Sequence, residues 1–183
     1  MKLSEADILI APGLGNSPAE HWQRRWGGRM SNARFIEQDE WNAPVVADWT
    51  ARIHQEILLA TRPVVLIGHS LSVAAIVITA ARLVDTKVRG AFLVSPPDFE
   101  GENIPPEALA FAPPSDPLPF PSMVVASTTD PLVTVSRARD FAADWGADFQ
   151  LAGDAGHINV ASGHGPWPEG LLMLGELMKR LKA

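Results

Sequence analysis

The chain has 183 residues, a formal net charge of −6 and no cysteine. This length suits one domain that buries its core without disulfides or a structural metal, and the missing cysteine also excludes thiolate metal sites and cysteine nucleophiles. The acidic balance and the absence of a basic run argue against a nucleic-acid-binding surface. Acidic residues stand where a signal peptide needs its apolar core, and no window holds the ~20 apolar residues of a membrane helix, so we expect a cytoplasmic protein without a membrane segment.

The chain begins with a strand, a turn and a helix. Residues 8–11 are apolar throughout and precede the turn sequence of residues 12–16, which predicts a short buried strand. Beyond the turn, Ser17 is a suitable helix N-cap, and Glu20 can complete a capping box with it. We therefore expect a helix that starts directly after this serine and ends at the glycine pair of residues 27–28.

Two further strand–helix pairs follow. Residues 33–36 predict a short edge strand, because the run is brief and leads into charged residues. The next helix is expected to be capped by Asp48 and to bury one face. Residues 64–67 are apolar throughout, as in a central parallel strand covered on both sides, and the helix predicted over residues 71–83 is apolar nearly all round.

The second half of the chain repeats this alternation around one irregular segment. Further strands are predicted over residues 90–94, 123–126 and 148–151, and further helices over residues 136–145 and from Pro168 onwards. Prolines within residues 98–121 preclude a long helix or a central strand there. A loop of this length is either functional or a surface excursion, so the segment is a candidate cover for one side of a cleft.

The alternation, with no internal repeat, predicts a single α/β domain over residues 1–183. Its architecture is a three-layer, doubly wound sandwich in which a mostly parallel sheet has right-handed crossovers. Ligands of such sheets bind beyond the carboxyl ends of the strands. The polar residues at those strand ends are therefore the candidates for a functional site.

Three such residues suit nucleophilic catalysis. Ser70 stands at a strand-to-helix turn, where a serine hydroxyl is exposed to solvent and to substrate. Asp130 and His157 follow the fifth and sixth predicted strands, and the order Ser, Asp, His is the one that α/β-hydrolases use. His157 would take the proton of the serine, and Asp130 would hold the imidazole in one tautomer.

A reaction at Ser70 also needs donors for the negative charge that develops on the substrate carbonyl. The backbone N–H of Leu71 and that of Leu14 or Gly15 are placed to form this oxyanion hole. Asn16, His21, Trp22 and Trp41 are the candidates for the substrate pocket, although such tryptophans are about as often simple core residues.

Each assignment has a structural alternative. A serine before a helix can be a simple N-cap, and Asp130 before a proline is also a turn signal. Asp39 and Asp154 are alternative acids, and His69 is expected to point away from the reacting atoms and to pack. No metal or cofactor is expected, because the remaining histidines show no metal-like spacing with carboxylates: His21, His54 and His164.

Several segments together resemble a known group. They are Pro12-Gly13-Leu14-Gly15-Asn16-Ser17, His21-Trp22 with Trp26, Gln38-Asp39-Glu40-Trp41, Gly68-His69-Ser70-Leu71-Ser72, Ser127-Thr128-Thr129-Asp130-Pro131, Gly156-His157-Ile158-Asn159 and Ser162-Gly163-His164-Gly165-Pro166-Trp167-Pro168. In these segments the chain resembles the RBBP9/YdeN family of small serine hydrolases over about residues 8–170.

The resemblance implies a minimal α/β-hydrolase fold without the amino-terminal hairpin of larger relatives, with about six mostly parallel strands in the order 2-1-3-4-5-6. It also implies a triad of Ser70, Asp130 and His157. One position departs from the family pattern, because Ser72 stands where the motif usually has glycine. We expect the turn to survive, since a serine hydroxyl can bond back into its own turn.

These observations predict a carboxylesterase-like serine hydrolase. It would cleave an ester, thioester or amide of a small molecule through an acyl-enzyme on Ser70. One alternative is a non-catalytic binding or protein-interaction module that retains the pocket. A flavodoxin-like nucleotide or flavin binder is disfavoured, because the glycines at positions 13 and 15 lack the G-x-G-x-x-G spacing.

Overall fold

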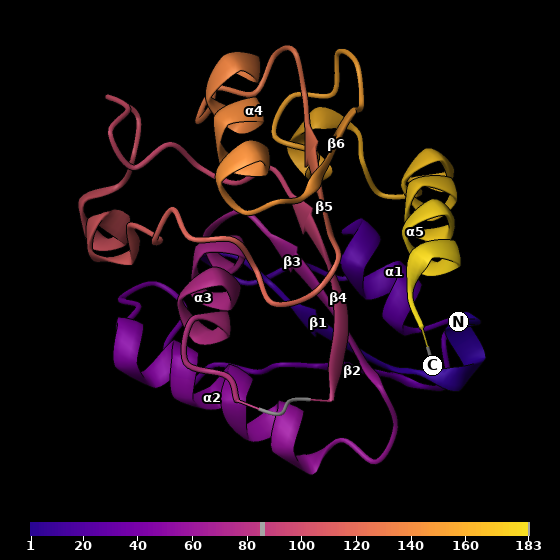
Figure 1. The fold of residues 1–183 in the computed structure, drawn as a ribbon. Coiled ribbons are helices and arrows are strands. Elements are labelled where there is room, and N and C mark those ends of the chain that lie inside the picture. Colours follow the sequence, from indigo (N-terminus) through magenta and orange to yellow (C-terminus); the bar gives the residue numbers. More distant parts are fainter. Residues whose placement is uncertain (85–86, 183) are drawn as a thin grey trace.

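The computed structural model describes residues 1–84 and 87–182, which build a sheet with helices on both faces (Figure 1). The sheet has six parallel strands in the order β2-β1-β3-β4-β5-β6. The predicted three-layer α/β fold and the predicted strand order are therefore confirmed. The strands are β1 (Asp7–Ala11), β2 (Ala33–Phe35), β3 (Val64–His69), β4 (Val88–Val94), β5 (Ser122–Ala126) and β6 (Asp148–Leu151).

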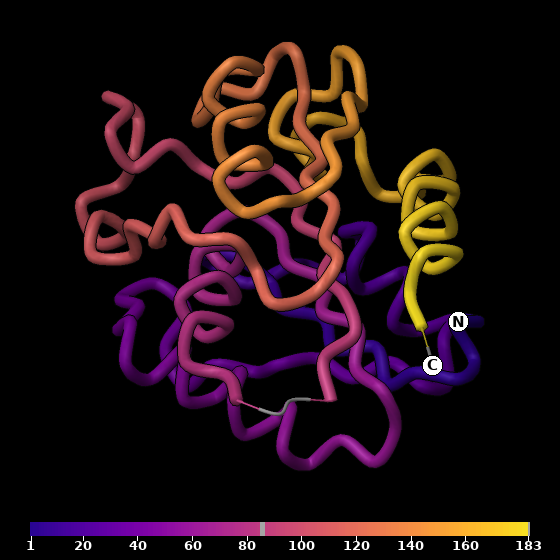
Figure 2. The backbone as a smooth tube through the Cα atoms, viewed as in Figure 1, coloured from indigo at the N-terminus to yellow at the C-terminus, as the bar shows by residue number. Residues whose placement is uncertain are grey.

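The helices form the two outer layers. In Figure 1, α2, α3 and α4 lie on one side of the sheet, and α1 and α5 lie on the other. Figure 2 shows the two ends of the chain side by side, where the amino group of Met1 donates to the carbonyl oxygen of Leu181 at 2.8 Å. The helices are α1 (Trp22–Gly27), α2 (Val46–Leu59), α3 (Leu71–Ala80), α4 (Val135–Asp144) and α5 (Pro168–Arg180).

The sheet has a hydrophobic core on each face, because successive strand side chains point to opposite sides. Leu66 of β3 packs on the side of α2 and α3, together with Trp49. Its neighbour Ile67 packs on the other side, together with Trp22 and Trp26 of α1. Since β3 is buried along its whole length, its carboxyl end is a rigid support for the turn that follows.

Two predicted helix starts are wrong. Ser17 does not cap α1, because its hydroxyl donates to Oε1 of Gln23 at 2.7 Å. The N-cap is His21 instead, whose Nδ1 accepts from the backbone N–H of Gln23 at 3.2 Å. Asp48 does not cap α2 either. That helix already begins at Val46, and Asp48 lies in its first turn, where a carboxylate favours the helix dipole.

The proline-rich segment of residues 98–121 is irregular, as predicted, apart from a 3₁₀ helix over Pro106–Phe111. Phe111 is fully buried and meets Trp49 edge-to-face, with ring centroids 5.5 Å apart. The segment is thereby anchored to the core on the α2 and α3 side. Among the residues that the structure describes, no helix is long and apolar enough to cross a membrane.

Candidate active site

Ser70 lies on the sharp turn between β3 and α3. Its backbone has φ 56° and ψ −127°, a conformation that non-glycine residues rarely adopt. Such strain persists where the surroundings fix the backbone, and here both flanking elements are buried in the core. Leu71 is the first residue of α3, so its backbone N–H has no acceptor within the helix and points out beside the serine.

Ser72 fits this turn and is bonded within it. Its Oγ accepts from the backbone N–H of His69 at 2.9 Å. The same oxygen lies 2.6 Å from the carbonyl oxygen of Ala11 and 3.0 Å from that of His69. The hydroxyl thus joins the first turn of α3 to the ends of β1 and β3. The expectation that a serine can replace glycine here agrees with this geometry.

Ser70, His157 and Asp130 form one chain of hydrogen bonds. Nε2 of His157 lies 2.8 Å from Oγ of Ser70. Nδ1 of the same ring lies 2.9 Å and 3.0 Å from the two carboxylate oxygens of Asp130. The Asp130 side chain is fully buried, and its Oδ1 also accepts the backbone N–H of Leu132 at 3.0 Å. The structure therefore brings together three residues that lie far apart in the sequence.

The loop that carries His157 is held from behind by two buried rings. Nε2 of His69 lies 2.8 Å from the carbonyl oxygen of His157, and Nε1 of Trp22 donates to the carbonyl oxygen of Ile158 at 2.9 Å. The bond from Trp22 holds a strained backbone, because Ile158 has φ 47°, which is unusual for a β-branched residue. Two consecutive carbonyl groups of this strained loop are thus fixed.

From the sequence we expected His69 to point away from the site, but in the structure it does not. Its ring centroid lies 5.0 Å from that of His157, and it lines the same cavity. Burial, and then the nearby charge of His157, hold the pKa of His69 well below its usual value. Because a carbonyl oxygen can only accept, Nε2 of the neutral ring carries the proton. His69 therefore supports the loop and does not face Ser70 as a base.

The turn after β1 passes directly over Ser70. A Cβ atom at Gly13 would lie 2.8 Å from the carbonyl oxygen of His69 and 3.0 Å from Cβ of Ser70, so only glycine fits there. The N–H of Gly15 already donates to the carbonyl oxygen of Trp41 at 3.0 Å. Within the described residues, the N–H of Leu14 has no acceptor. Of the two candidate donors in this turn, Leu14 is therefore the one whose N–H is free.

A cavity of about 220 Å³ opens beside Ser70. Of the predicted pocket residues, Asn16 and His21 line it, whereas Trp22 and Trp41 do not. Trp22 is fully buried under the His157 loop, and Trp41 packs edge-to-face on Trp49 with ring centroids 5.7 Å apart. The remaining lining residues are Gly13, Leu14, Pro18, His69, His157, Asn159, Val160 and Ala161.

The sequence analysis did not predict that the segment from Asn159 to Ala161 lines the pocket. It follows His157 directly in the chain, so its place beside that imidazole is a consequence of the loop. Burial, followed by the nearby charges of His157, Arg24 and His164, lowers the pKa of His21 to about 4. His21 is therefore neutral near neutral pH.

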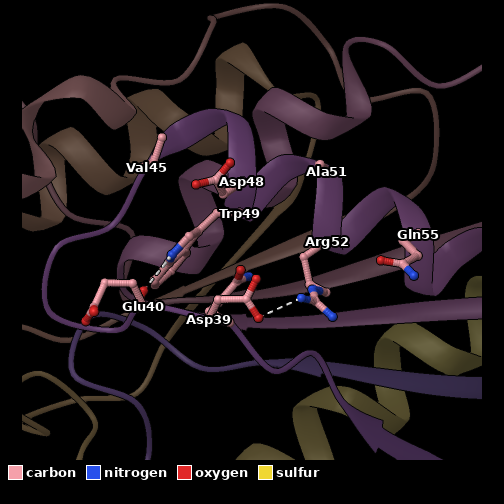
Figure 3. A pocket seen from close by; sticks show the side chains of 9 residues that line it. Asp39, Glu40, Val45, Asp48, Trp49, Ala51, Arg52 and Gln55 are labelled. Atoms are coloured by element: carbon pink, nitrogen blue, oxygen red, sulfur yellow. Dashed lines mark hydrogen bonds and ion pairs between the residues drawn. The ribbon is translucent and has the colours of Figure 1, made fainter.

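The two alternative acids lie elsewhere. Asp39 is exposed and pairs with Arg52 at 2.8 Å, in a second cavity between α2 and the loop before it (Figure 3). Asp154 accepts the hydroxyl of Thr129 at 2.6 Å. Neither carboxylate bonds His157, whereas Asp130 does.

In residues 1–84 and 87–182, no group of three or more histidines and carboxylates is arranged to hold a metal ion.

Comparisons with known proteins agree with this geometry. A family model described as "Serine hydrolase" matches residues 8–176. The crystal structure of a putative YdeN-like hydrolase from Pectobacterium atrosepticum is 32% identical and superposes with a TM-score of 0.86, covering 97% of this chain and 93% of that chain.

Other solved structures share the fold at lower identity. The ydeN gene product of B. subtilis is 20% identical, with a TM-score of 0.80 over 96% of this chain and 100% of that one. The esterase domain of a Rhodothermus marinus protein is 15% identical, with a TM-score of 0.69 over 94% and 87%. No curated protein sequence matches the chain significantly.

Proposed function

This chain belongs to the serine hydrolase family, and from that premise we propose that it is a carboxylesterase-like enzyme that forms an acyl-enzyme on Ser70. Its substrate would be an ester, thioester or amide of a small molecule. The observation that carries the proposal is the chain of hydrogen bonds from Ser70 through His157 to Asp130, at 2.8 Å and 2.9 Å. This is the arrangement that makes a serine hydroxyl a nucleophile.

Acylation follows from that arrangement. Oγ of Ser70 attacks the carbonyl carbon while Nε2 of His157 takes the hydroxyl proton. Asp130 keeps the other ring proton on Nδ1 and stabilises the imidazolium, without being protonated itself. The carbonyl oxygen becomes an oxyanion between the backbone N–H groups of Leu71 and Leu14. One such donor typically contributes ~3 kcal/mol to transition-state stabilisation.

The same groups then complete the reaction. The imidazolium of His157 returns its proton to the departing alcohol, thiol or amine as the bond to the leaving group breaks. A water molecule next loses a proton to His157 and attacks the acyl carbonyl. The acid is released and Ser70 regains its proton. The cavity of about 220 Å³ is smaller than the ~300–1,000 Å³ of typical ligand pockets, which supports a small acyl group.

A panel of short-chain aryl esters tests the proposal. Wild type is expected to hydrolyse at least some of them, and Ser70→Ala is expected to lose nearly all of that activity while keeping the wild-type unfolding curve. A folded wild type with no hydrolysis that depends on Ser70 would contradict the proposal. That result would favour a binding module that retains the hydrolase pocket.

A further inference from the structure

Two hydrogen bonds fix the side-chain carboxamide of Asn16 through its oxygen and leave its NH₂ group free. Its Oδ1 accepts the backbone N–H of Ser17 at 2.7 Å and Nη2 of Arg24 at 2.9 Å. Arg24 is itself held, since it donates to Glu37 at 3.0 Å and to the carbonyl oxygen of Ser17 at 3.1 Å. Both acceptor positions of the amide oxygen are therefore filled. Among the described residues Nδ2 has no acceptor, and Asn16 lines the cavity beside Ser70.

Asn159 repeats this arrangement on the other side of the cavity. It caps the 3₁₀ helix over Val160–Ser162, and its Oδ1 accepts the backbone N–H of Ser162 at 3.1 Å. The hydroxyl of Ser162 lies 3.3 Å from the same oxygen. The cap sets the orientation of the amide, so Nδ2 is again the free polar atom. No acceptor for it exists in the part of the chain that the structure describes.

His21 supplies a third donor. Its side chain is buried, with 3% exposure, and its Nδ1 accepts the backbone N–H of Gln23. An imidazole that accepts at Nδ1 carries its proton on Nε2. That Nε2–H has no acceptor in residues 1–84 or 87–182. Asn16, Asn159 and His21 all line one small cavity, and each carries a side-chain donor without an acceptor among the described residues.

Apart from the hydroxyl of Ser70, the rest of the cavity offers no acceptor side chain and no full charge. Its walls include no aspartate, glutamate, lysine or arginine. His157 is bonded to Ser70 and Asp130, and His69 is bonded to the carbonyl oxygen of His157. A donor that a bound substrate covers without replacing its water costs about 1–3 kcal/mol. A plain alkyl chain is therefore a poor occupant of this cavity.

We propose that this donor-lined cavity selects small acyl esters that carry a second, uncharged oxygen acceptor, such as a ketone, close to the scissile carbonyl. The inference rests on the proposed function and names the substrate class of the same site. A ketone oxygen can accept from Asn16, Asn159 or His21 and so replaces the water that it displaces. A carboxylate is a weaker candidate, because no cation lines the cavity to offset its desolvation.

A pair of esters of equal length tests this substrate class. In p-nitrophenyl 4-oxopentanoate a carbonyl group replaces one methylene of p-nitrophenyl pentanoate, and the leaving group is the same. Each kcat/KM is divided by the rate of alkaline hydrolysis of the same ester, to remove its intrinsic reactivity. The ratio that we compare is the corrected kcat/KM of the oxo ester divided by that of the pentanoate ester. For wild type we expect this ratio to be about ten or more, which corresponds to about 1.4 kcal/mol. The hemisuccinate ester is expected to be a poorer substrate than the oxo ester.

Variants identify the donors. Asn159→Asp and Asn16→Asp each keep the bonded oxygen acceptor and turn the free donor into an acceptor; both are expected to bring the ratio down towards one. Gln55→Leu is the matched control, because it removes an exposed carboxamide of α2 outside this cavity. Its ratio is expected to equal that of wild type.

Three outcomes overturn the inference, and they are distinguishable. If wild type hydrolyses pentanoate in a Ser70-dependent way but shows a ratio of one or less, the substrate class is wrong and the proposed function stands. If neither ester is hydrolysed in a Ser70-dependent way, the proposed function falls and the inference falls with it. A high ratio that both asparagine variants retain would also contradict it.

Discussion

The indole N–H of Trp22 donates to the carbonyl oxygen of Ile158 at 2.9 Å, although 136 residues separate the two. Ile158 follows the proposed base His157 and has a positive φ of 47°. A β-branched residue adopts that conformation only where neighbours enforce it. With the bond from His69 to the carbonyl oxygen of His157, this contact ties the base to α1 and to the end of β3.

Trp22→Phe removes this donor and keeps an aromatic ring. We expect kcat to fall about tenfold with a smaller change in KM, because the lost bond holds the backbone directly after the proposed base His157. The free energy of unfolding should fall by about 1–3 kcal/mol, since a buried carbonyl loses its partner. Steady-state kinetics with an aryl ester and urea unfolding measure the two effects.

Trp26→Phe is the control for this prediction. Trp26 packs against Trp22 with ring centroids 4.6 Å apart, but in the described part of the chain its indole N–H has no acceptor. Trp26→Phe therefore makes the same change from an indole to a phenyl ring without the loss of a hydrogen bond. Equal losses of kcat in the two variants would show that ring size, and not the bond to Ile158, holds the loop.

Ser72 is expected to stabilise the protein relative to the glycine that the family motif usually has. Ser72→Ala leaves the buried N–H of His69 without its acceptor, which costs about 1–3 kcal/mol of unfolding free energy. Ser72→Gly removes the same bonds and adds the backbone freedom of glycine, so it should be the less stable of the two. Urea unfolding compares them. A glycine variant as stable as wild type would mean that the hydroxyl contributes nothing.

The free energy of unfolding should fall as the pH is lowered, because His21 is buried in its neutral form. Its pKa is near 6.5 in the unfolded chain and about 4 in the folded protein, because burial disfavours the charged form. Between these values the unfolded chain binds more protons. The contribution of His21 is therefore fully present above about pH 6.5 and is lost as the pH falls towards 4. The lowered pKa of His69 acts in the same direction.

His21→Asn isolates this contribution. Asparagine is a good N-cap but does not titrate in this range, so α1 keeps a cap. Between about pH 7.5 and about pH 5 the variant should lose about 2 kcal/mol less unfolding free energy than wild type. Urea unfolding at both pH values measures the difference. Parallel losses in the two proteins would show that His21 titrates as it does in the unfolded chain.

Gly13→Ala should reduce activity strongly. The added Cβ would meet the carbonyl oxygen of His69 at 2.8 Å and so push the turn that carries Leu14 away from Ser70. We expect kcat/KM to fall by about a hundredfold, as on loss of an oxyanion donor. Gly175→Ala is the control, since nothing lies within 4 Å of its new Cβ in α5. It should keep full activity and gain up to about 1 kcal/mol of stability.

The sequence was sufficient for the sheet and for the residues at its carboxyl edge. Apolar runs such as the one over β3 identify buried parallel strands, and the ends of parallel strands meet at one edge. The juxtaposition of Ser70, Asp130 and His157 follows from that topology. Their catalytic roles stay predictions that the variants above and the labelling below test.

What the sequence could not reveal depends on contacts between distant segments. Ser17 has the pattern of an N-cap, yet its hydroxyl bonds Gln23 and the cap passes to His21. Trp22 looks like a pocket residue from its place after the first turn, but its ring lies under the His157 loop. Local preference predicts neither result, because each is decided by packing against residues elsewhere in the chain.

Covalent labelling tests the central claim most directly. A fluorophosphonate reacts with a serine only where a base activates the hydroxyl and donors stabilise the adduct. Wild type should gain one adduct mass on the peptide that contains Ser70. Ser70→Ala should gain none, and His157→Ala should react far more slowly. A folded wild type that stays unlabelled, or one labelled on a different serine, would contradict the account.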